Sequence, residues 1–485
     1  MDYVPRHTME RALRRLGRRA LADRLHAMRA LADVRGVRYL DDRGRARTID
    51  VALKPWILTS DQLFCFHWVA QLLSDALLRL AHLHARVPAV RQVVRFEPER
   101  ERWMRLAAHP RSRPLAVIGR LDSTAIYDHA DWRAAFRMLE PNAVGVGGVH
   151  YAPTGCAITL DVLGDVLAAA LPGRALTATP DPRQLLMEEL EAVAARLRRP
   201  LRGLALIENT DFTTGTDEFQ ELARYFRRLG LSVVVADPRE LRLAGGRLYA
   251  GRTPVDLLYR DSELAEFIEM ERRGAKLTAL RQAIREGRLI SGLAWEFDQK
   301  SAWEIFTDAR YTGAFTREQR RLFREHLLWT RLVREERVSD PQGRLVDLPA
   351  YIRRHQSRLV LKPNTLFGGE GVLIGSEVSR REWERGLGTA LRACPAPSRP
   401  TAPAGQAGGD GRQGKERYVV QERAAIPTDT FPSLTERGSV TWQERCVVSG
   451  FFFSSTGVGL VGRFSGQSIV NVSRGGGLIP ALWVH

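Results

Sequence analysis

Apolar residues recur at helical intervals over the first quarter of the chain. Between residue 8 and about residue 110 the pattern is helical, and Ser60 with Asp61 is a typical cap in front of an apolar stripe. The stripe consists of Leu63, Phe66, Val69, Leu72, Leu73 and Leu77. Such a stripe indicates core packing more often than a ligand pocket. We therefore predict a helical N-terminal lobe over residues 1–113 and assign it no chemistry.

After Pro114 the pattern changes to short apolar runs. LAVIGRLD and RMLEPNAV predict two strands, separated by a helical DHADWRAAF and followed by the glycine-rich VGVGG. Arg120 and Asp122 occupy alternate positions of the first strand, as Glu140 and Asn142 do in the second, so each pair shares one face. An ion pair or a turn cap would explain each residue singly. We take residues 114–200 as a segment that carries functional polar groups.

Residues 201–290 show the order strand, turn, helix and strand of a parallel βαβ unit, in LRGLALIENTDFTTGTDEFQELARYFRRLGLSVVVADPREL. Thr213, Thr214, Gly215 and Thr216 fall between the first strand and the helix. Backbone N–H groups and hydroxyls there can hold an anionic substrate group, although a simple helix cap explains them equally well. We predict a substrate lobe.

The sharpest local pattern lies in the last segment, residues 291–485. LVLKPNTLFGGEGVLIG predicts a strand that ends at Lys362, a turn with Gly368, Gly369 and Gly371, and a second strand. A lysine on a rigid strand presents a fixed positive charge, and glycines let backbone N–H groups approach phosphate oxygens. The order of a P-loop is absent. The pattern favours a nucleoside triphosphate site.

The rest of this segment is less specific. YVVQERA places Gln421 and Glu422 after an apolar strand, where an adenine could bond to them. The stretch rich in Pro, Ala and Gly predicts a flexible insertion over residues 392–417. RCVVSGFFFSS, GLVGRF and SIVNVS predict further strands.

Composition changes this picture little. The net charge is +17 and the pI about 10.4, but only five of the 73 basic residues are lysine, and the arginines are spread along the chain. A spread of this kind does not indicate a nucleic-acid partner, which would favour one clustered basic surface. The four cysteines show no C-x-x-C spacing, and we find no signal-peptide core or membrane-spanning run, so we expect a cytoplasmic protein without a membrane partner.

Together these motifs resemble the ATP-grasp superfamily, in which a lysine strand, a glycine loop and a Q-E or M-E hinge hold ATP. Ordinary members carry an E-x-N metal motif after the hinge, but here the motif stands far upstream, as Glu140-Pro141-Asn142. That order is similar to the circularly permuted ATP-grasp proteins, which include glutathionylspermidine synthases and eukaryotic glutathione synthetases. The resemblance covers roughly residues 115–485 and implies an α/β fold of that permuted type.

The resemblance also implies roles for single residues. Magnesium ligands would be Asp122, Glu140 and Asn142. ATP contacts would be Lys300, Lys362, Gly368, Gly369, Gly371, Gln421 and Glu422. Arg120 and Arg463 would face an acyl phosphate, and Arg474, Gly475, Gly476 and Gly477 would close over the substrate. Eukaryotic glutathione synthetases have a further metal-binding glutamate in the glycine loop, a place that Asn364, Glu370 or no residue fills here.

The implied activity is ATP- and magnesium-dependent ligation of a carboxylate to an amine through an acyl phosphate. The partners would be small-molecule or peptide substrates, whose identity the sequence leaves open along with the oligomeric state. Two alternatives remain: an ATP-dependent phosphotransferase on the same fold, and a non-catalytic nucleotide-binding protein.

Overall fold

The computed structural model describes residues 3–41, 43–107, 117–124, 127–211, 215–216, 218–366, 368–394, 416–435, 437–470, 472 and 475–485. The chain forms two compact units. The first comprises Met1–Leu78, Pro98–Asp298 and Ile426–His485, and the second comprises Arg79–Glu97 and Gln299–Ala425. Each unit is thus assembled from segments that lie far apart in the sequence.

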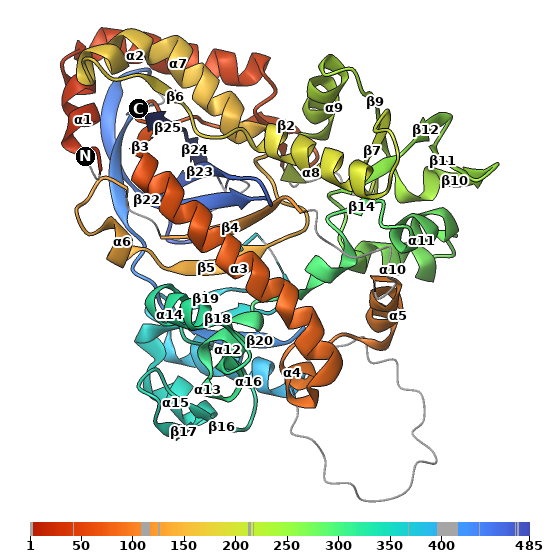
Figure 1. The fold of residues 1–485 in the computed structure, drawn as a ribbon. Coiled ribbons are helices and arrows are strands. Elements are labelled where there is room, and N and C mark those ends of the chain that lie inside the picture. The colour runs from red at the N-terminus through yellow and green to blue at the C-terminus, as the bar shows by residue number, and fades with distance from the viewer. Residues whose placement is uncertain are drawn as a thin grey trace, which may run out of the picture. The chain divides into compact units, whose positions relative to one another are not determined.

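An antiparallel sheet forms the centre of the first unit (Figure 1). Its strands follow the order β24 (Gly477–Ile479), β23 (Val458–Ser465), β22 (Val440–Phe453), β4 (Gly119–Ser123) and β5 (Met138–Asn142), and β21 (Thr428–Leu434) pairs with the first half of β22. Two strands from the first third of the chain therefore lie beside strands from its end. The predicted strands around Arg120 and Glu140 are confirmed.

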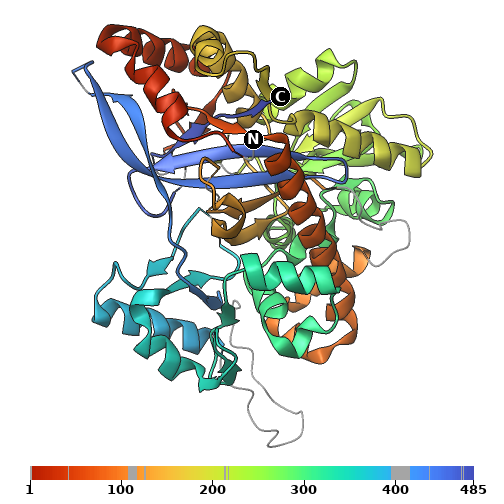
Figure 2. The ribbon, with the colours of Figure 1, turned by 60° about the vertical axis from the view of Figure 1, so that its left-hand side comes forward.

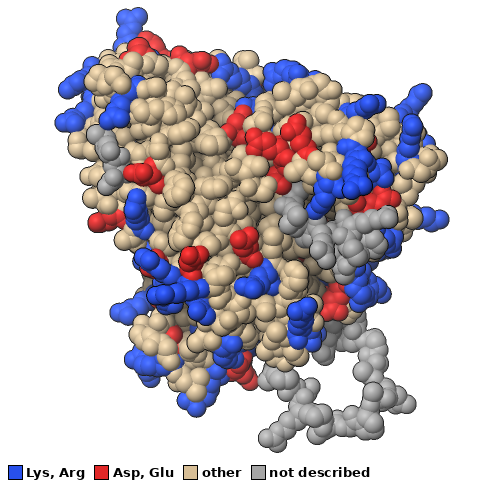
Figure 3. Space-filling model, in the orientation of Figure 1, with Lys and Arg blue, Asp and Glu red and all other residues tan. Residues whose placement is uncertain are grey.

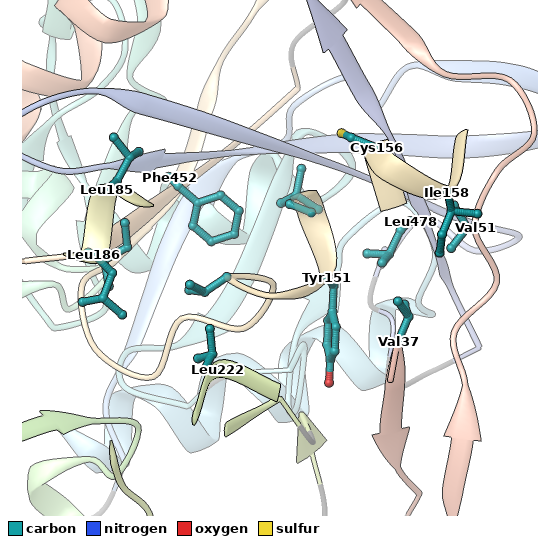
Figure 4. Close-up of a cluster of buried hydrophobic side chains, with 14 of the residues drawn as sticks. Val37, Val51, Tyr151, Cys156, Ile158, Leu185, Leu186, Leu222, Phe452 and Leu478 are labelled. Carbon is teal, nitrogen blue, oxygen red and sulfur yellow. The ribbon is translucent and has the colours of Figure 1, made fainter. Parts of the chain in front are cut away.

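Side chains of β22 alternate between two cores, as the period of a strand requires. Phe451 stacks on Phe66 of α3 (Ser60–Arg86), with ring centroids 4.5 Å apart. Phe452 faces the other way, and Figure 4 shows it near Leu185, Leu186 and Tyr151. The central sheet is therefore covered by helices on both faces.

Two helices, α3 and α7 (Tyr151–Ala170), are long and apolar enough to cross a membrane by length and composition alone. The buried shares of their most apolar stretches are 50% and 56%. In α7, Tyr151, Cys156 and Ile158 contribute to the core drawn in Figure 4. Burial in that core accounts for the apolar sequence of α7.

The predicted βαβ unit is confirmed. Strands β14 (Leu289–Ile290), β13 (Leu257–Arg260), β7 (Gly203–Ile207) and β9 (Ser232–Ala236) form a parallel sheet in that order, and α9 (Phe219–Arg228) connects β7 to β9. The other elements of the first unit are α1 (His7–Arg14), α2 (Gly17–Val34), β1 (Arg38–Leu40), β2 (Ala46–Thr48), β3 (Trp56–Leu58), α5 (Pro98–Ala107), α6 (Trp132–Ala135), β6 (Leu176–Ala178), α8 (Pro182–Arg196), β8 (Gly215–Thr216), β10 (Leu241–Ala244), β11 (Arg247–Ala250), β12 (Thr253–Val255), α10 (Leu264–Arg272), α11 (Thr278–Arg285) and β25 (Ala481–Val484).

The second unit is built on the sheet β15 (Thr330–Leu332), β20 (Tyr418–Glu422), β18 (Leu359–Pro363) and β19 (Leu373–Ile374). Leu359, Leu361 and Val420 pack against Trp383 and Leu387 of α16 (Arg380–Ala393). The opposite face carries polar residues of β18 and β20. The remaining elements are α4 (Pro88–Val93), α12 (Ala302–Thr307), α13 (Ala309–Thr312), α14 (Arg317–His326), β16 (Arg337–Ser339), β17 (Leu345–Asp347) and α15 (Leu348–Arg354).

One predicted strand is wrong. The described residues of SIVNVS, 468–470 and 472, are not in a strand. The backbone N–H of Gly475 bonds to the carbonyl of Val472, so the chain turns there before β24 begins. Most of the predicted insertion, residues 395–415, lies outside the described residues.

Candidate functional site

Strands β4 and β5 bring the four predicted polar residues onto one face of the central sheet. Arg120 lies directly opposite Asn142, and Asp122 lies opposite Glu140. Directly opposite residues of an antiparallel pair point to the same side. The structure therefore confirms the placement that the alternation of the strands predicted, and it adds the pairing between them.

Strands β22 and β23 bring Arg463 to the same face. Gly450 of β22 pairs with Asp122 on one side and with Val461 on the other, and Arg463 stands two positions beyond Val461. A Cβ atom on Gly450 would lie 2.6 Å from Cδ of Arg120 and 2.9 Å from its Cγ. Glycine is thus needed at position 450 because the Arg120 side chain crosses the strand there.

The two arginines bind Asp122 unequally. Arg120 donates from Nε to Oδ1 of Asp122 at 2.8 Å, from Nη2 to Oδ2 at 3.3 Å and from Nη1 to the carbonyl of Gly147 at 2.6 Å. Arg463 approaches Oδ1 of Asp122 through Nη2 at 2.8 Å, and its buried Nε has no hydrogen-bond partner in the described part of the chain. All three side-chain nitrogens of Arg120 are thus bonded within the protein, whereas Nε of Arg463 is not. The contact of the two arginines with an acyl phosphate stays a prediction.

The charges in this cluster are balanced. Burial alone would raise the pKa of Asp122, but the guanidinium groups of Arg120 and Arg463 outweigh it and hold the pKa below its ordinary value. The negative charge of Glu140 acts to raise the pKa of both arginines. Asp122 is consequently a carboxylate at neutral pH, as a metal ligand or an arginine partner must be.

The donor set suits a hard cation by its chemistry. Asp122 and Glu140 supply carboxylate oxygens, and Asn142 uses Nδ2 to donate to the carbonyl of Arg120 at 3.4 Å, which leaves its amide oxygen as the acceptor. Magnesium prefers oxygen ligands of this kind. This site offers two carboxylates and one amide, and among the described residues no group of three or more His, Cys, Asp or Glu is placed to hold a metal ion.

A glycine loop follows Asn142 and is held by residues that the sequence did not single out. Asp298 accepts a hydrogen bond from the backbone N–H of Ala143 at 2.7 Å. Glu218 accepts from Gly148 at 2.7 Å and from His150 at 2.9 Å. Burial raises the pKa of both carboxyl groups to about 7. Neither residue belongs to a recognisable motif, so only their three-dimensional position reveals them.

In the second unit, Lys362 and Gln421 lie on the polar face of the sheet. Nζ of Lys362 donates to Oε1 of Gln421 at 2.7 Å, and Nε2 of Gln421 donates to Oγ1 of Thr330 at 3.0 Å. Glu422 accepts from the backbone N–H of Trp329 at 3.1 Å. The structure therefore brings Lys362 and Gln421 together on one face of two neighbouring antiparallel strands. Glu422 pairs with Leu359 and so lies on the opposite face, and its predicted contact with adenine stays a prediction.

Lys300 is tied to the base of the second glycine loop through Asn364. The backbone N–H of Lys300 bonds to the carbonyl of Asn364 at 3.2 Å, and that of Ser301 bonds to the Asn364 side-chain oxygen at 2.8 Å. Nζ of Lys300 donates to the carbonyl of Leu366 at 2.7 Å. Asn364 is buried and also donates to Gln299. Its amide is thus engaged in a structural tie, which leaves it poorly suited as a metal ligand.

The loop itself requires glycine. Gly368, Gly369 and Gly371 have φ angles of 69°, 74° and 66°, in the left-handed region that other residues rarely adopt. A Cβ atom on Gly371 would lie 2.8 Å from Cγ of Pro363. Glycine is therefore required by the backbone at these positions, and the approach of phosphate to the loop stays a prediction.

The predicted substrate residues are only partly described. Thr213, Thr214 and Arg474 lie outside the described residues. Gly475 has a φ of 81° and Gly476 leads directly into β24. These predictions stay predictions.

The basic charge is not gathered on the face drawn in Figure 3, where blue and red side chains are interspersed. Several arginines are buried in ion pairs instead: Arg260 bonds to Glu296, and Arg331 lies near Asp308. Much of the arginine content thus has a structural use.

Figure 2 shows the ribbon turned by 60°, with the helices of the first unit on both sides of its blue strands.

No protein-family model and no curated protein sequence matches the chain. Among solved structures, a putative gamma-glutamylcysteine synthetase from Methylobacillus flagellatus KT aligns over 82% of this chain and 83% of its own, at 14% identity, but its TM-score of 0.38 carries no weight. A glutathione synthetase-like effector from Globodera pallida, solved in its apo form, aligns over 96% of this chain and 97% of its own, with a TM-score of 0.62 and 9% identity. The chain therefore has a mixed α/β fold that is similar to the fold of this glutathione synthetase-like protein.

Proposed function

We propose that this protein is a magnesium-dependent ligase that uses ATP to join a carboxylate to an amine. The observation that carries the proposal is the common face of β4, β5 and β23, on which Arg120, Asp122, Glu140, Asn142 and Arg463 meet. If Asp122 only formed structural ion pairs with Arg120 and Arg463, the amide of Asn142 and the second carboxylate of Glu140 would not be needed beside them. The name of the Globodera pallida protein, a glutathione synthetase-like effector, agrees with this class.

In the first unit, Asp122, Glu140 and Asn142 would hold magnesium, which when bound neutralises phosphate charge. Arg120 keeps Asp122 in place through two hydrogen bonds. Arg463 would stabilise the acyl phosphate with the donor that the protein leaves unused, because a fixed guanidinium in a buried site acts strongly on developing charge.

In the second unit, Lys362 and Lys300 would bind the phosphates of ATP, and Gln421 with Glu422 would bind adenine. The substrate carboxylate attacks the terminal phosphate, ADP leaves, and the amine then displaces phosphate from the acyl carbon. The glycines at 368, 369 and 371 would place backbone N–H groups at the phosphates and exclude water. The chemistry needs no protein nucleophile.

The test is ADP formation from magnesium-ATP with pools of amino acids, short peptides and polyamines. Glu140→Gln removes a predicted ligand, and Glu240→Gln, at an exposed glutamate, is the matched control. We expect turnover that requires an acid and an amine together and that is lost only in Glu140→Gln. A phosphorylated acid that accumulates without amine would indicate the phosphotransferase instead. Failure to bind ATP in calorimetry would exclude both activities.

A further inference from the structure

The segment from Ala143 to His150 follows the predicted magnesium ligand Asn142 and is held at three points. Asp298 binds its first backbone N–H, Arg120 binds the carbonyl of Gly147, and Glu218 binds the N–H groups of Gly148 and His150. Hydrogen bonds to charged groups are stronger than neutral ones. At the far end of the loop, Glu218 accepts two backbone N–H groups, and the ring of His150 adds a contact of 2.9 Å with the carbonyl of Arg35.

Glu218 is well placed for this task. It immediately precedes α9, and only 4% of its surface is exposed. Its two carboxylate oxygens each accept one backbone N–H, Oε1 from Gly148 and Oε2 from His150. In glutamine an NH2 group replaces one of the two oxygens, and because this group cannot accept a hydrogen bond, one of the two backbone N–H groups loses its partner in this arrangement.

The contact reaches the candidate site in two steps. Gly148 is bonded covalently to Gly147, whose carbonyl receives Nη1 of Arg120, and Arg120 in turn fixes both oxygens of Asp122. Gly148 has a φ of 105°, and a Cβ atom there would lie 3.0 Å from the ring of Phe452. Phe452 of the central sheet thus leaves little space beside Gly148, and Glu218 binds the backbone N–H of the same residue.

We infer that Glu218 is a positioning residue of the candidate ligase site, which anchors the Ala143–His150 loop and through it the Arg120–Asp122 pair. The inference rests on the proposed function for its catalytic consequence. The anchoring of the loop rests on the hydrogen bonds alone.

The test compares Glu218→Gln with Glu189→Gln at pH 8. Glu189 is an equally buried glutamate, 1% exposed, whose carboxylate accepts the backbone N–H of Ser455 in the turn after β22. Both variants lose one charge from the interior of the same unit, so a general loss of stability appears in both. We expect faster amide exchange in residues 143–150 only in Glu218→Gln, measured by mass spectrometry. We also expect its kcat/KM to fall roughly 10- to 100-fold, with a higher magnesium requirement, as misplaced catalytic groups produce.

Glu218→Asp provides a second variant if Glu218→Gln does not fold. It keeps both oxygens and the charge but is one methylene shorter, so we expect the same effects in weaker form. Unchanged exchange in residues 143–150, or kinetic constants equal to those of Glu189→Gln, would overturn the inference. A wild-type protein that does not bind ATP would refute the proposed function, and the exchange comparison would then decide alone whether Glu218 anchors the loop.

Discussion

Replacing Gly450 by alanine tests the geometry at the centre of the candidate site. The new Cβ atom would lie 2.6 Å from Cδ of Arg120, 2.9 Å from its Cγ and 3.1 Å from Cγ1 of Val461. Real Cβ contacts essentially never fall below 3.0 Å, so Arg120 must move by at least 0.4 Å. It cannot swing away freely, because three of its nitrogen atoms are bonded to Asp122 and Gly147.

Overpacking of this kind costs about 1–3 kcal/mol of unfolding free energy. Displacing Arg120 also moves Asp122, so we expect kcat/KM for ATP to fall roughly 10- to 100-fold. Urea denaturation measures the first effect and ADP release measures the second. Gly164→Ala in α7 is the control: nothing lies within 4 Å of its added Cβ, and alanine should stabilise the helix by up to about 1 kcal/mol.

A Gly450→Ala protein with wild-type stability would refute the reasoning at its structural step, because it would show that Arg120 does not cross β22 as described. Normal ATP turnover despite the expected loss of stability would refute the functional step, in which Arg120 holds Asp122 for catalysis. The two assays therefore separate an error in the fold from an error in the proposed activity.

Changes at four positions, with one control position, test other parts of the site. Asp122→Asn leaves two largely buried guanidinium groups without their carboxylate and should lower the unfolding free energy by roughly 3–5 kcal/mol, measured with urea. The pKa of Asp122 is lowered in the folded state. The greater stability of the wild type should therefore be present above the unfolded pKa and disappear as pH falls through the folded pKa. Burial raises the pKa of Glu218 from 4.5 to about 7, so unfolding free energy should decrease as pH rises across that window, and Glu218→Gln should flatten this slope in urea titrations at pH 5 and 8. Asn364→Ala removes the side-chain bonds to Ser301 and Gln299, which help to hold the base of the glycine loop, and should weaken ATP binding by about tenfold in calorimetry. Asn364→Asp keeps the bond from Ser301 and should lose less. Lys362→Arg keeps the charge but not the ammonium geometry, so it should also weaken ATP binding. Lys276→Arg, at an exposed site, is the control and should leave ATP binding unchanged. Equal ATP affinities of the two variants would contradict the role of Lys362.

The local part of this fold was accessible from the sequence. Alternation within LAVIGRLD and RMLEPNAV placed Arg120 with Asp122 and Glu140 with Asn142, because the side-chain period of a strand is fixed at two. The sequence of the βαβ unit likewise predicted β7, α9 and β9 in their observed order. The side-chain period of a strand does not indicate which other strand it pairs with, however. It could therefore not show that β22, some 300 residues later in the chain, lies beside β4.

Contacts that join distant segments were missed for the same reason. Glu218 and Asp298 hold a loop 70 and 155 residues away in the sequence, through backbone N–H groups that any residue could offer. Gln421 was predicted from its place after an apolar strand, but its bond to Lys362 follows from the pairing of β18 with β20. Side-chain chemistry predicts which groups can bind a ligand, and only the tertiary fold decides which of them meet.

The choice between lysine and arginine adds an argument about the second unit. Only five of the 73 basic residues are lysine, so a basic position filled without regard to chemistry would carry arginine. The arginine ion pairs follow that expectation, since Arg120, Arg260 and Arg331 use the guanidinium fork to reach several acceptors at once. Lys54, which forms a buried ion pair with Asp429 in the first unit, does not follow it. The two positions that the resemblance assigns to ATP phosphates, Lys300 and Lys362, both depart from it. An ammonium group is a compact point charge with three rotatable donors, which can follow a phosphate as its charge changes. The two lysines therefore agree with the phosphate ligand that the resemblance implies for the second unit.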